Sequence, residues 1–281
     1  MTRTAAFFDL DGTLIPGSAN IPLALAAFRR GFVPPRALAR DLWHGITFLM
    51  RGASDDRAAE VRERILGAVA GHPVADVVAL GAGFIPRLAT TVTPEARTIL
   101  DAHLRVGHDR IVVSATSQEI VAMLADTLGL EHAAGTRSEI VEGRYTGRLD
   151  GPFCYGEGKA HAIREMARVQ GYDLPGCYAY SDSVSDLPLL EAVGHPVVVN
   201  PEKHLRAVAE ERGWPVVEVA ATGWRRLLAR HGAPESGPVR TEPARDVART
   251  APTEYDRRSD SGTGDGDQNR TWVALGSSGT G

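Results

Sequence analysis

The sequence predicts an α/β fold in which a Rossmann-like, doubly wound parallel sheet is interrupted by an inserted helical segment. Two observations predict this fold. Helical and strand patterns alternate along the chain after Pro94, as they do when helices cover both faces of a parallel sheet. One isolated strand pattern lies near the N-terminus, and residues 18–89 between these two parts show only helical patterns.

The isolated strand covers residues 5–8, which are all apolar and lead directly into Asp9. A continuous apolar run this short is typical of a strand that is buried on both faces of a parallel sheet. Gly12-Thr13 and Pro16-Gly17 then break the pattern, so the strand is followed by a turn.

The inserted segment shows four helical patterns, separated by Gly and Pro, over residues 21–30, 34–52, 54–71 and 74–88. The last pattern is the weakest, because it contains Gly81 and Gly83. We therefore predict a helical domain of residues 18–89, inserted into a core domain that is formed by residues 1–17 and 90–231.

The alternating part of the chain predicts helices over residues 95–106, 117–128, 158–170, 187–193 and 202–211. It predicts strands over residues 110–114, 177–181, 196–199 and 216–219, and a hairpin over residues 139–149 that turns at Glu142 and Gly143. Residues 232–281 are rich in Gly, Ser, Thr, Pro, Arg and Asp, with almost no apolar periodicity, so we predict a disordered tail.

Composition excludes several classes of protein. The apolar share of 43% and the charged share of 23% are those of a soluble globular protein, and no run of eighteen apolar residues predicts a membrane span. A formal charge of -4 argues against a general nucleic-acid binder. The apolar run after Met1 is too short for a signal peptide, and the two cysteines, Cys154 and Cys177, are interpreted as reduced and packed, which predicts a cytoplasmic protein.

The first segment with chemical potential is Asp9 to Thr13, at the carboxyl end of the first strand. Asp9 and Asp11 occupy alternate positions where open α/β sheets bind ligands. One carboxylate can serve as a nucleophile and the other as a proton donor, with a cation offsetting their repulsion. A solvated turn explains the same residues equally well.

Two further residues are candidates for holding a phosphoryl group. Ser114 ends an apolar strand and precedes Ala115 and a helix, so its hydroxyl and nearby backbone N–H groups can donate to phosphoryl oxygens. Helix capping is the simpler interpretation of Ser114 alone. Lys159 begins a helix, where a cation is unfavourable unless an anion lies nearby. An exposed lysine that points to solvent is the commoner explanation of Lys159 alone.

The last segment is Ser181 to Pro188, which brings Asp182 and Asp186 to another strand end. A small number of hard oxygen ligands suits Mg²⁺, which keeps several waters and shares phosphate oxygens. The chain has no Cys/His pattern for zinc. We therefore predict that Asp182 is a direct ligand of Mg²⁺.

As an ordered set, these segments resemble the haloacid dehalogenase superfamily of phosphohydrolases over residues 5 to about 220. The helical insert directly after the first motif resembles the cap of the phosphoserine-phosphatase-like branch, family IB. The resemblance implies that Asp9 attacks phosphorus and becomes an aspartyl phosphate. It implies that Asp11 is the general acid and base, and that Ser114, Ala115 and Lys159 bind the transferring phosphoryl group.

The resemblance also implies the metal ligands. Asp182 would join the Asp9 carboxylate and the Asp11 backbone carbonyl on Mg²⁺, with Asp186 supporting that site. This arrangement agrees with the physics of phosphoryl transfer, which depends mainly on alignment and on charge neutralisation.

The expected substrate is a small phosphomonoester that fits beneath the cap. Phosphoserine is weakened as a candidate because Ser18 stands where the phosphoserine enzymes carry a Glu, so a sugar or polyol phosphate is an alternative. A phosphotransferase or phosphomutase would use the same chemistry on Asp9, and a non-catalytic binding protein is a third hypothesis. The sequence predicts no oligomeric state.

Overall fold

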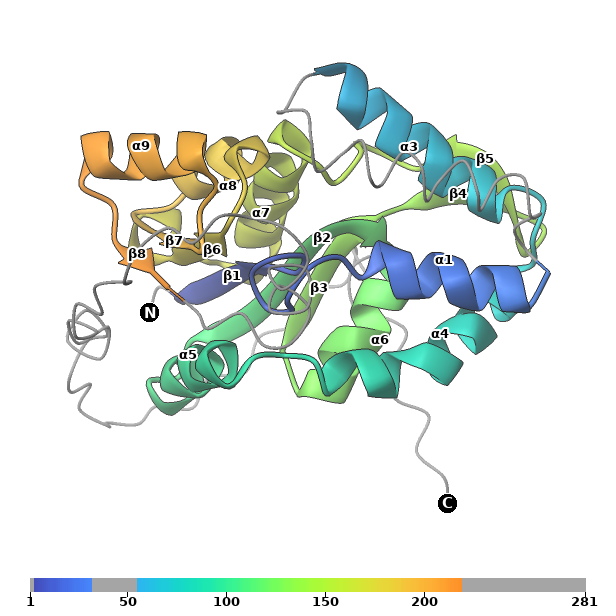
Figure 1. Ribbon diagram of the computed structural model, residues 1–281, viewed down its shortest axis with the longest axis horizontal. Coiled ribbons are helices and arrows are strands. Elements are labelled where there is room, and N and C mark those ends of the chain that lie inside the picture. Colours follow the sequence, from blue (N-terminus) through green and yellow to red (C-terminus); the bar gives the residue numbers. More distant parts are fainter. Residues whose placement is uncertain (1–2, 32–54, 219–281) are drawn as a thin grey trace, which may run out of the picture.

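The computed structural model describes residues 3–31 and 55–218 (Figure 1). The predicted helix over residues 34–52 and the predicted tail over residues 232–281 lie outside the described residues. The other predicted helices and strands lie within them, except for residue 54 of the predicted helix over residues 54–71 and residue 219 of the predicted strand over residues 216–219.

The core is a six-stranded parallel sheet, and its strand order confirms the predicted doubly wound fold. The order is β3-β2-β1-β6-β7-β8, with β1 in the middle of the sheet (Figure 1). The strands are β1 (Ala5–Asp9), β2 (Asp109–Ser117), β3 (His132–Thr136), β6 (Tyr178–Ser181), β7 (His195–Val199) and β8 (Val216–Val217).

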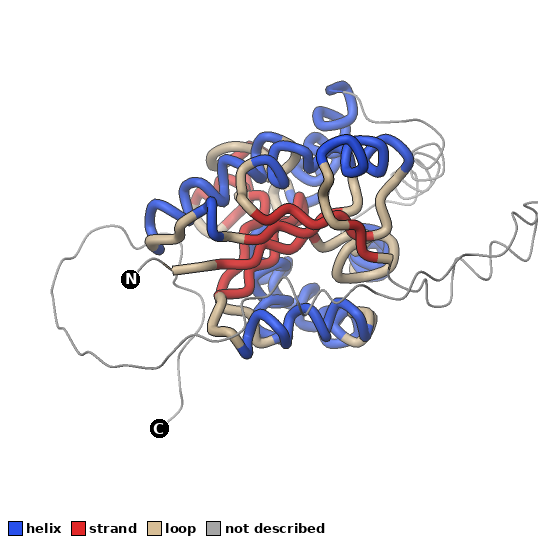
Figure 2. Tube along the Cα trace, turned by 90° about the vertical axis from the view of Figure 1, so that its left-hand side faces the viewer, coloured by secondary structure: helices blue, strands red, loops and turns tan. Residues whose placement is uncertain are grey.

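The core helices cover both faces of this sheet (Figure 2). Side chains of β1 alternate between the two faces: Phe8 joins one apolar cluster and Phe7 the other. Among the described residues, no single helix is long and apolar enough to cross a membrane. The core helices are α5 (Pro94–Arg105), α6 (Gln118–Leu128), α7 (Glu157–Gln170), α8 (Leu187–Glu191) and α9 (Lys203–Arg212), with 3-10 turns at Leu174–Gly176 and Val184–Asp186.

The insert contributes helices α1 (Asn20–Arg29), α3 (Asp55–Val69) and α4 (Val74–Ala89). An antiparallel hairpin, β4 (Ser138–Val141) and β5 (Arg144–Leu149), lies beside α3 (Figure 1). Its backbone bonds to the turn between α3 and α4: Gly71 N–H donates to the Tyr145 carbonyl at 2.8 Å, and Tyr145 N–H donates to the His72 carbonyl at 3.1 Å. The hairpin, placed by the sequence in the core segment, therefore packs against the insert.

The structure corrects the expected elements at β2 and β3. Strand β3 was not predicted, because its sequence is rich in Ala and Gly rather than in β-branched residues. The glycine at position 135 is needed for close packing, because a Cβ there would lie 2.8 Å from both the Gln118 Cα and the Thr116 carbonyl oxygen. Strand β2 extends past Ser114 to Ser117, so α6 begins at Gln118 rather than at Ser117.

The strand register brings the predicted chemical segments to one edge of the sheet. Asp9, the last residue of β1, pairs with Val113, which places Ser114 one residue further along β2. On the other side of β1, Phe8 pairs with Tyr180, and β6 ends one residue later at Ser181. The carboxyl ends of the three central strands therefore form the candidate site.

Candidate active site

Asp9 and Lys159 form the centre of the site. Asp9 is 5% exposed and Lys159 is 4% exposed. The Lys159 Nζ atom donates to Asp9 Oδ1 at 2.5 Å and to Asp186 Oδ2 at 2.7 Å. Burial raises the pKa of Asp9 to about 7 against the opposing effect of the Lys159 charge.

Lys159 is held in place by the tight turn before α7. A Cβ on Gly158 would lie 1.7 Å from the Phe153 carbonyl oxygen, so only glycine fits before the lysine. Burial alone would lower the pKa of Lys159, but the carboxylates of Asp186 and Asp9 raise it above its ordinary value. These carboxylates are the nearby anions that a lysine at this helix start requires.

Asp11 is positioned by the first residues of the insert. Its Oδ1 atom accepts from the Ala19 backbone N–H at 2.7 Å, and its Oδ2 atom accepts from the Ser18 hydroxyl at 3.0 Å. Burial raises the pKa of Asp11, and these two hydrogen bonds act in the opposite direction. A carboxyl group with a raised pKa suits the role of a general acid and base.

Asp182 lies directly against the turn of the first motif. Gly12 has a φ of +81°, and a Cβ there would lie 2.0 Å from Asp182 Oδ2. Glycine is thus required twice, for its backbone conformation and for the close approach of the carboxylate. Burial raises the pKa of Asp182 well above its ordinary value, and the charges of Asp9 and Asp186 add to that shift.

Asp186 is 1% exposed and accepts hydrogen bonds from two other residues of the site. Its Oδ2 atom accepts from Lys159 Nζ and, at 2.7 Å, from the Ser181 hydroxyl. Its Oδ1 atom is buried and has no hydrogen-bond partner in the described part of the chain. Such an oxygen is costly unless another donor or a cation satisfies it.

The residues present fit a magnesium ion. Burial, together with the charges of neighbouring carboxylates, raises the pKa of Asp9 and of Asp182, and the Lys159 ammonium forms ion pairs with Asp9 and Asp186. No group of three or more His, Cys, Asp or Glu side chains within residues 3–31 and 55–218 forms a preassembled metal cluster. Mg²⁺ does not need one, because one or two carboxylates, waters and substrate phosphate oxygens complete its coordination.

Ser114 is 3% exposed and lies in β2 one residue beyond Val113, the partner of Asp9, rather than at the end of the strand as the sequence predicted. Its hydroxyl accepts from the Thr116 N–H at 3.2 Å, and the Ala115 carbonyl accepts from the Thr136 hydroxyl at 2.6 Å. These contacts fix the backbone at the end of β2, just after Ser114. Burial raises the pKa of the nearby Cys154 thiol to about 12. A hydrogen bond from the Ser114 backbone acts in the opposite direction.

The structure therefore places the predicted residues of all four segments at one sheet edge. Both cysteines are free and buried, in agreement with the prediction of packed thiols. Sequence reasoning missed the roles of Ser18 and Ser181. Ser18 precedes a helix, and Ser181 ends a strand next to an Asp, so from the sequence alone each is assigned to capping or to a turn rather than to its partner, Asp11 or Asp186.

Comparison with known proteins agrees with this geometry. A model of the haloacid dehalogenase-like hydrolase family matches residues 6–191. A Mycobacterium tuberculosis protein named "Probable phosphatase Rv3661" is 44% identical over 216 residues, which are 76% of this chain and 75% of that protein. "Phosphoserine phosphatase SerB1" of the same organism is 37% identical over 235 residues, which are 83% of this chain and 75% of that protein.

Solved structures show the same fold. A Bordetella pertussis protein of unknown function is 33% identical with a TM-score of 0.65, and the match covers 77% of this chain and 99% of that one. A substrate-bound phosphoserine phosphatase has a TM-score of 0.56 and covers 82% of this chain and 99% of that one; at 18% identity it shows the fold alone.

The chain belongs to the haloacid dehalogenase-like hydrolase family. The predicted family is thereby confirmed, and the relatives named phosphatases confirm the predicted class of phosphoric monoester hydrolase. The cytoplasmic location, the boundaries of the core and cap domains and the role of each site residue stay predictions.

Proposed function

We propose that this protein is a Mg²⁺-dependent phosphatase that hydrolyses a small phosphomonoester through an aspartyl phosphate on Asp9, in the cytoplasm. The contact between Asp9 Oδ1 and Lys159 Nζ at 2.5 Å carries the proposal, because it orients one carboxylate and offsets its charge in a buried site. The relatives that are named phosphatases support the same reaction class.

In the proposed reaction, the Asp9 carboxylate attacks phosphorus and displaces the alcohol oxygen of the substrate. Asp11 donates a proton to that leaving oxygen and then accepts one from the water that hydrolyses the acyl phosphate. The raised pKa of Asp11 supports the donor role. The water supplies the last oxygen of the released phosphate, and Asp9 returns as a carboxylate.

Ser114 and Lys159 would hold the phosphoryl group during both steps. The Ser114 hydroxyl and the backbone of Ala115 are donors, and the Lys159 ammonium offsets the negative charge of the equatorial oxygens. Asp9, Asp182 and the Asp11 backbone carbonyl would hold Mg²⁺, with Asp186 beside them. When bound, Mg²⁺ supplies charge neutralisation for the phosphoryl oxygens.

The substrate class in this proposal is a small phosphomonoester of the phosphoserine, polyol or sugar type. The insert and hairpin lie over the same end of the molecule as the carboxyl ends of β1 and β2 (Figure 1). A cap in this position favours a small substrate and excludes water during transfer.

The experiment is phosphate release from a panel of phosphomonoesters with Mg²⁺, with EDTA, and with Mg²⁺ added back after EDTA. The panel contains phosphoserine, histidinol phosphate, glycerol phosphates and sugar phosphates. The proposal predicts release that EDTA stops and that added Mg²⁺ restores. Release that is equally fast in EDTA, or no release from any ester by folded protein with Mg²⁺, would contradict it.

A further inference from the structure

Strand β2 bulges next to Ser114. The register between β2 and β3 shifts between Val113 and Ser117, whose partners on β3 are only two residues apart. Three residues of β2 therefore lie opposite one residue of β3. Bulges of this kind re-aim groups of the chain and are common beside active sites. Of residues 110–117 only Ala115 is not buried, so the bulge is open at the residue whose backbone is proposed to bind the phosphoryl group.

Side chains at two positions hold this bulge to β3. The Thr136 hydroxyl donates to the Ala115 carbonyl at 2.6 Å, and Thr136 is fully buried. The Gln118 side chain accepts from the Gly135 N–H at 2.6 Å and donates to the Ala133 carbonyl at 3.3 Å. The end of β2 is therefore held to β3 at the bulge and again at the first residue of α6.

The hydrogen bond from Thr136 acts on a peptide group that also contacts Ser114. The Ala115 carbonyl and the Thr116 N–H belong to one planar trans peptide, so they point in opposite directions. The Thr116 N–H donates to the Ser114 hydroxyl oxygen at 3.2 Å. A donor at the carbonyl therefore fixes the direction of the N–H, and it strengthens the bond that the N–H donates by polarising the peptide.

The bond from Thr116 also decides what the Ser114 hydroxyl can do. A hydroxyl group has one hydrogen to donate and two lone pairs that accept. Because the Ser114 oxygen accepts from the Thr116 N–H, one lone pair is occupied and the hydrogen is directed to another acceptor. In the proposed reaction that acceptor is a phosphoryl oxygen at Asp9, since Asp9 pairs with Val113, the residue before Ser114.

We infer that Thr136 is a positioning residue for phosphoryl transfer, which acts through the Ala115–Thr116 peptide and the Ser114 hydroxyl. The inference rests on the proposed phosphatase function and adds to it a residue that does not itself contact the substrate. Charge develops on the phosphoryl oxygens in the transition state, so a donor that is already aimed at them contributes more there than in the ground state. Loss of the Thr136 hydroxyl should therefore lower kcat more than it raises KM.

The test compares Thr136→Val with Thr136→Ser in the full-length protein with Mg²⁺, on the best substrate of the phosphomonoester panel. Valine keeps the volume of threonine but lacks the hydroxyl, whereas serine keeps the hydroxyl but lacks a buried methyl group. Thr136→Val is predicted to lower kcat about 10-fold, the effect of about one hydrogen bond, and to leave KM within about twofold. Thr136→Ser is predicted to keep both constants within about twofold. A purely structural role would not spare Thr136→Ser, because the lost methyl group leaves a cavity beside the bulge.

A double-mutant cycle with Ser114→Ala tests whether Thr136 acts through the Ser114 hydroxyl. The measurement is the Kd of orthovanadate, which takes the five-coordinate geometry of the transferring phosphoryl group, by calorimetry with Mg²⁺. Thr136→Val alone is predicted to raise this Kd about 10-fold, but to change it by no more than about twofold when Ser114 is already Ala. The same 10-fold loss in both backgrounds would overturn the inference.

Thr127→Val is the matched control, because the Thr127 hydroxyl also donates to a backbone carbonyl, that of Met123 on α6, at 2.8 Å. It should leave kcat and KM unchanged. If Thr136→Val does not fold, as judged by circular dichroism, Thr136→Ala takes its place, since it differs from Thr136→Ser by the hydroxyl alone.

Three results would overturn the inference and leave the phosphatase proposal standing. They are an unchanged kcat in Thr136→Val, an equal loss of kcat in Thr136→Ser, and an equal loss in Thr127→Val. No phosphate release by the folded wild-type protein with Mg²⁺ would contradict the phosphatase proposal itself, and the orthovanadate cycle would then decide the inference.

Discussion

At the residue scale, one buried ammonium group organises the site. Lys159 bonds to Asp9 and Asp186, and Ser181 adds a second donor to Asp186. The sequence motifs predicted the acids and the lysine, because each follows a strand or begins a helix. They could not predict that Asp186 contacts Lys159, since that contact joins residues 27 positions apart through the packing of α7 against the sheet.

Replacing Lys159 by Met tests this network. Two buried carboxylates would lose their shared cation, so the free energy of unfolding at pH 7 should fall by about 3–5 kcal/mol, as for other broken buried ion pairs. Phosphate release should be lost as well. The measurement is urea denaturation followed by circular dichroism.

Lys203→Met is the control for that substitution. Lys203 is exposed at the start of α9, so its removal should change the free energy of unfolding by no more than about 0.5 kcal/mol. Equal effects of the two substitutions would mean that the Lys159 network does not stabilise the fold.

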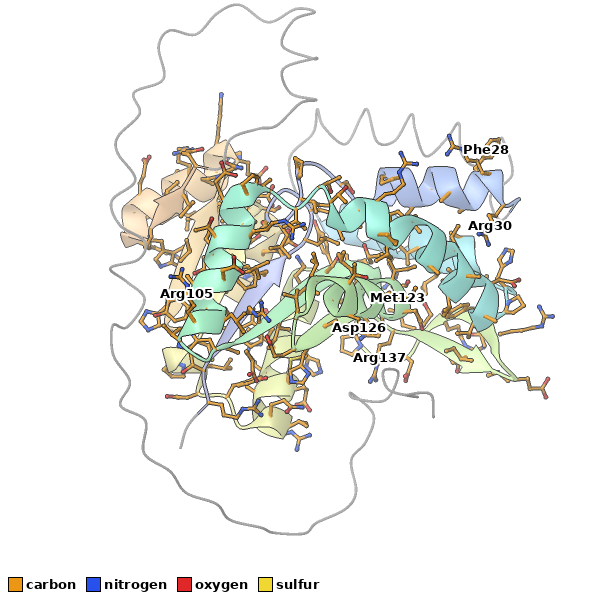
Figure 3. All side chains as sticks on the ribbon, turned by 90° about the horizontal axis from the view of Figure 1, so that it is seen from below. Phe28, Arg30, Arg105, Met123, Asp126 and Arg137 are labelled. Carbon is orange, nitrogen blue, oxygen red and sulfur yellow. The ribbon has the colours of Figure 1, made fainter. Side chains whose placement is uncertain are left out.

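At the element scale, the close packing of α4 against α6 joins the insert to the core. Figure 3 shows Met123 on α6, and a Cβ on Gly81 of α4 would lie 2.9 Å from its sulfur and 2.7 Å from Ile120 Cδ1. In the sequence, Gly81 and Gly83 weakened the helix prediction for this segment, because glycine lowers helix propensity. The contact with α6 explains why position 81 is a glycine. The apolar periodicity of α4 could not predict this contact, because it depends on a second helix.

Gly81→Val should therefore overpack the interface between α4 and α6. The expected loss in the free energy of unfolding is about 1–3 kcal/mol. Gly67→Val in α3 is the matched control, because no atom lies within 4 Å of a Cβ there. Valine has the higher helix propensity, so Gly67→Val should be neutral or stabilising by a few tenths of a kcal/mol, about the difference between the two residues. Urea midpoints that shift equally would contradict the packing argument.

At the scale of the whole molecule, the parallel sheet carries a catalytic edge and a separate packing cluster. The carboxyl ends of the strands carry the acids, and a cluster of His and Tyr side chains joins α5 to β6. His103 is 4% exposed; its Nε2 atom lies 2.8 Å from the Tyr180 hydroxyl, and its Nδ1 atom lies 2.9 Å from His108 Nδ1. The sequence predicted the parallel sheet but gave no signal for this cluster, whose members lie on separate elements.

The cluster predicts a loss of stability in acid. Burial, with the charges of His108 and Arg110, lowers the pKa of His103 to about 3 from an ordinary value of 6.5. Between these pH values the unfolded chain binds a proton at this position and the folded chain does not, so lowering the pH favours unfolding. The contribution of His103 should approach about 1.4 kcal/mol for each pH unit below 6.5.

The measurement is the free energy of unfolding in urea from pH 7 to pH 4, for wild type and for His103→Asn. The substitution should flatten the pH dependence by the contribution of His103. Parallel curves for the two proteins would show that His103 does not stay neutral in the fold.

The central claim is that Asp9 carries the phosphoryl group. The most direct measurement is borohydride reduction of the protein during turnover of its best substrate with Mg²⁺, followed by mass spectrometry of the peptide that contains Asp9. Borohydride reduces an acyl phosphate to an alcohol, so the account predicts homoserine at position 9 and unmodified Asp11, Asp182 and Asp186. Turnover without reduction of Asp9, or reduction at another carboxylate, would contradict it.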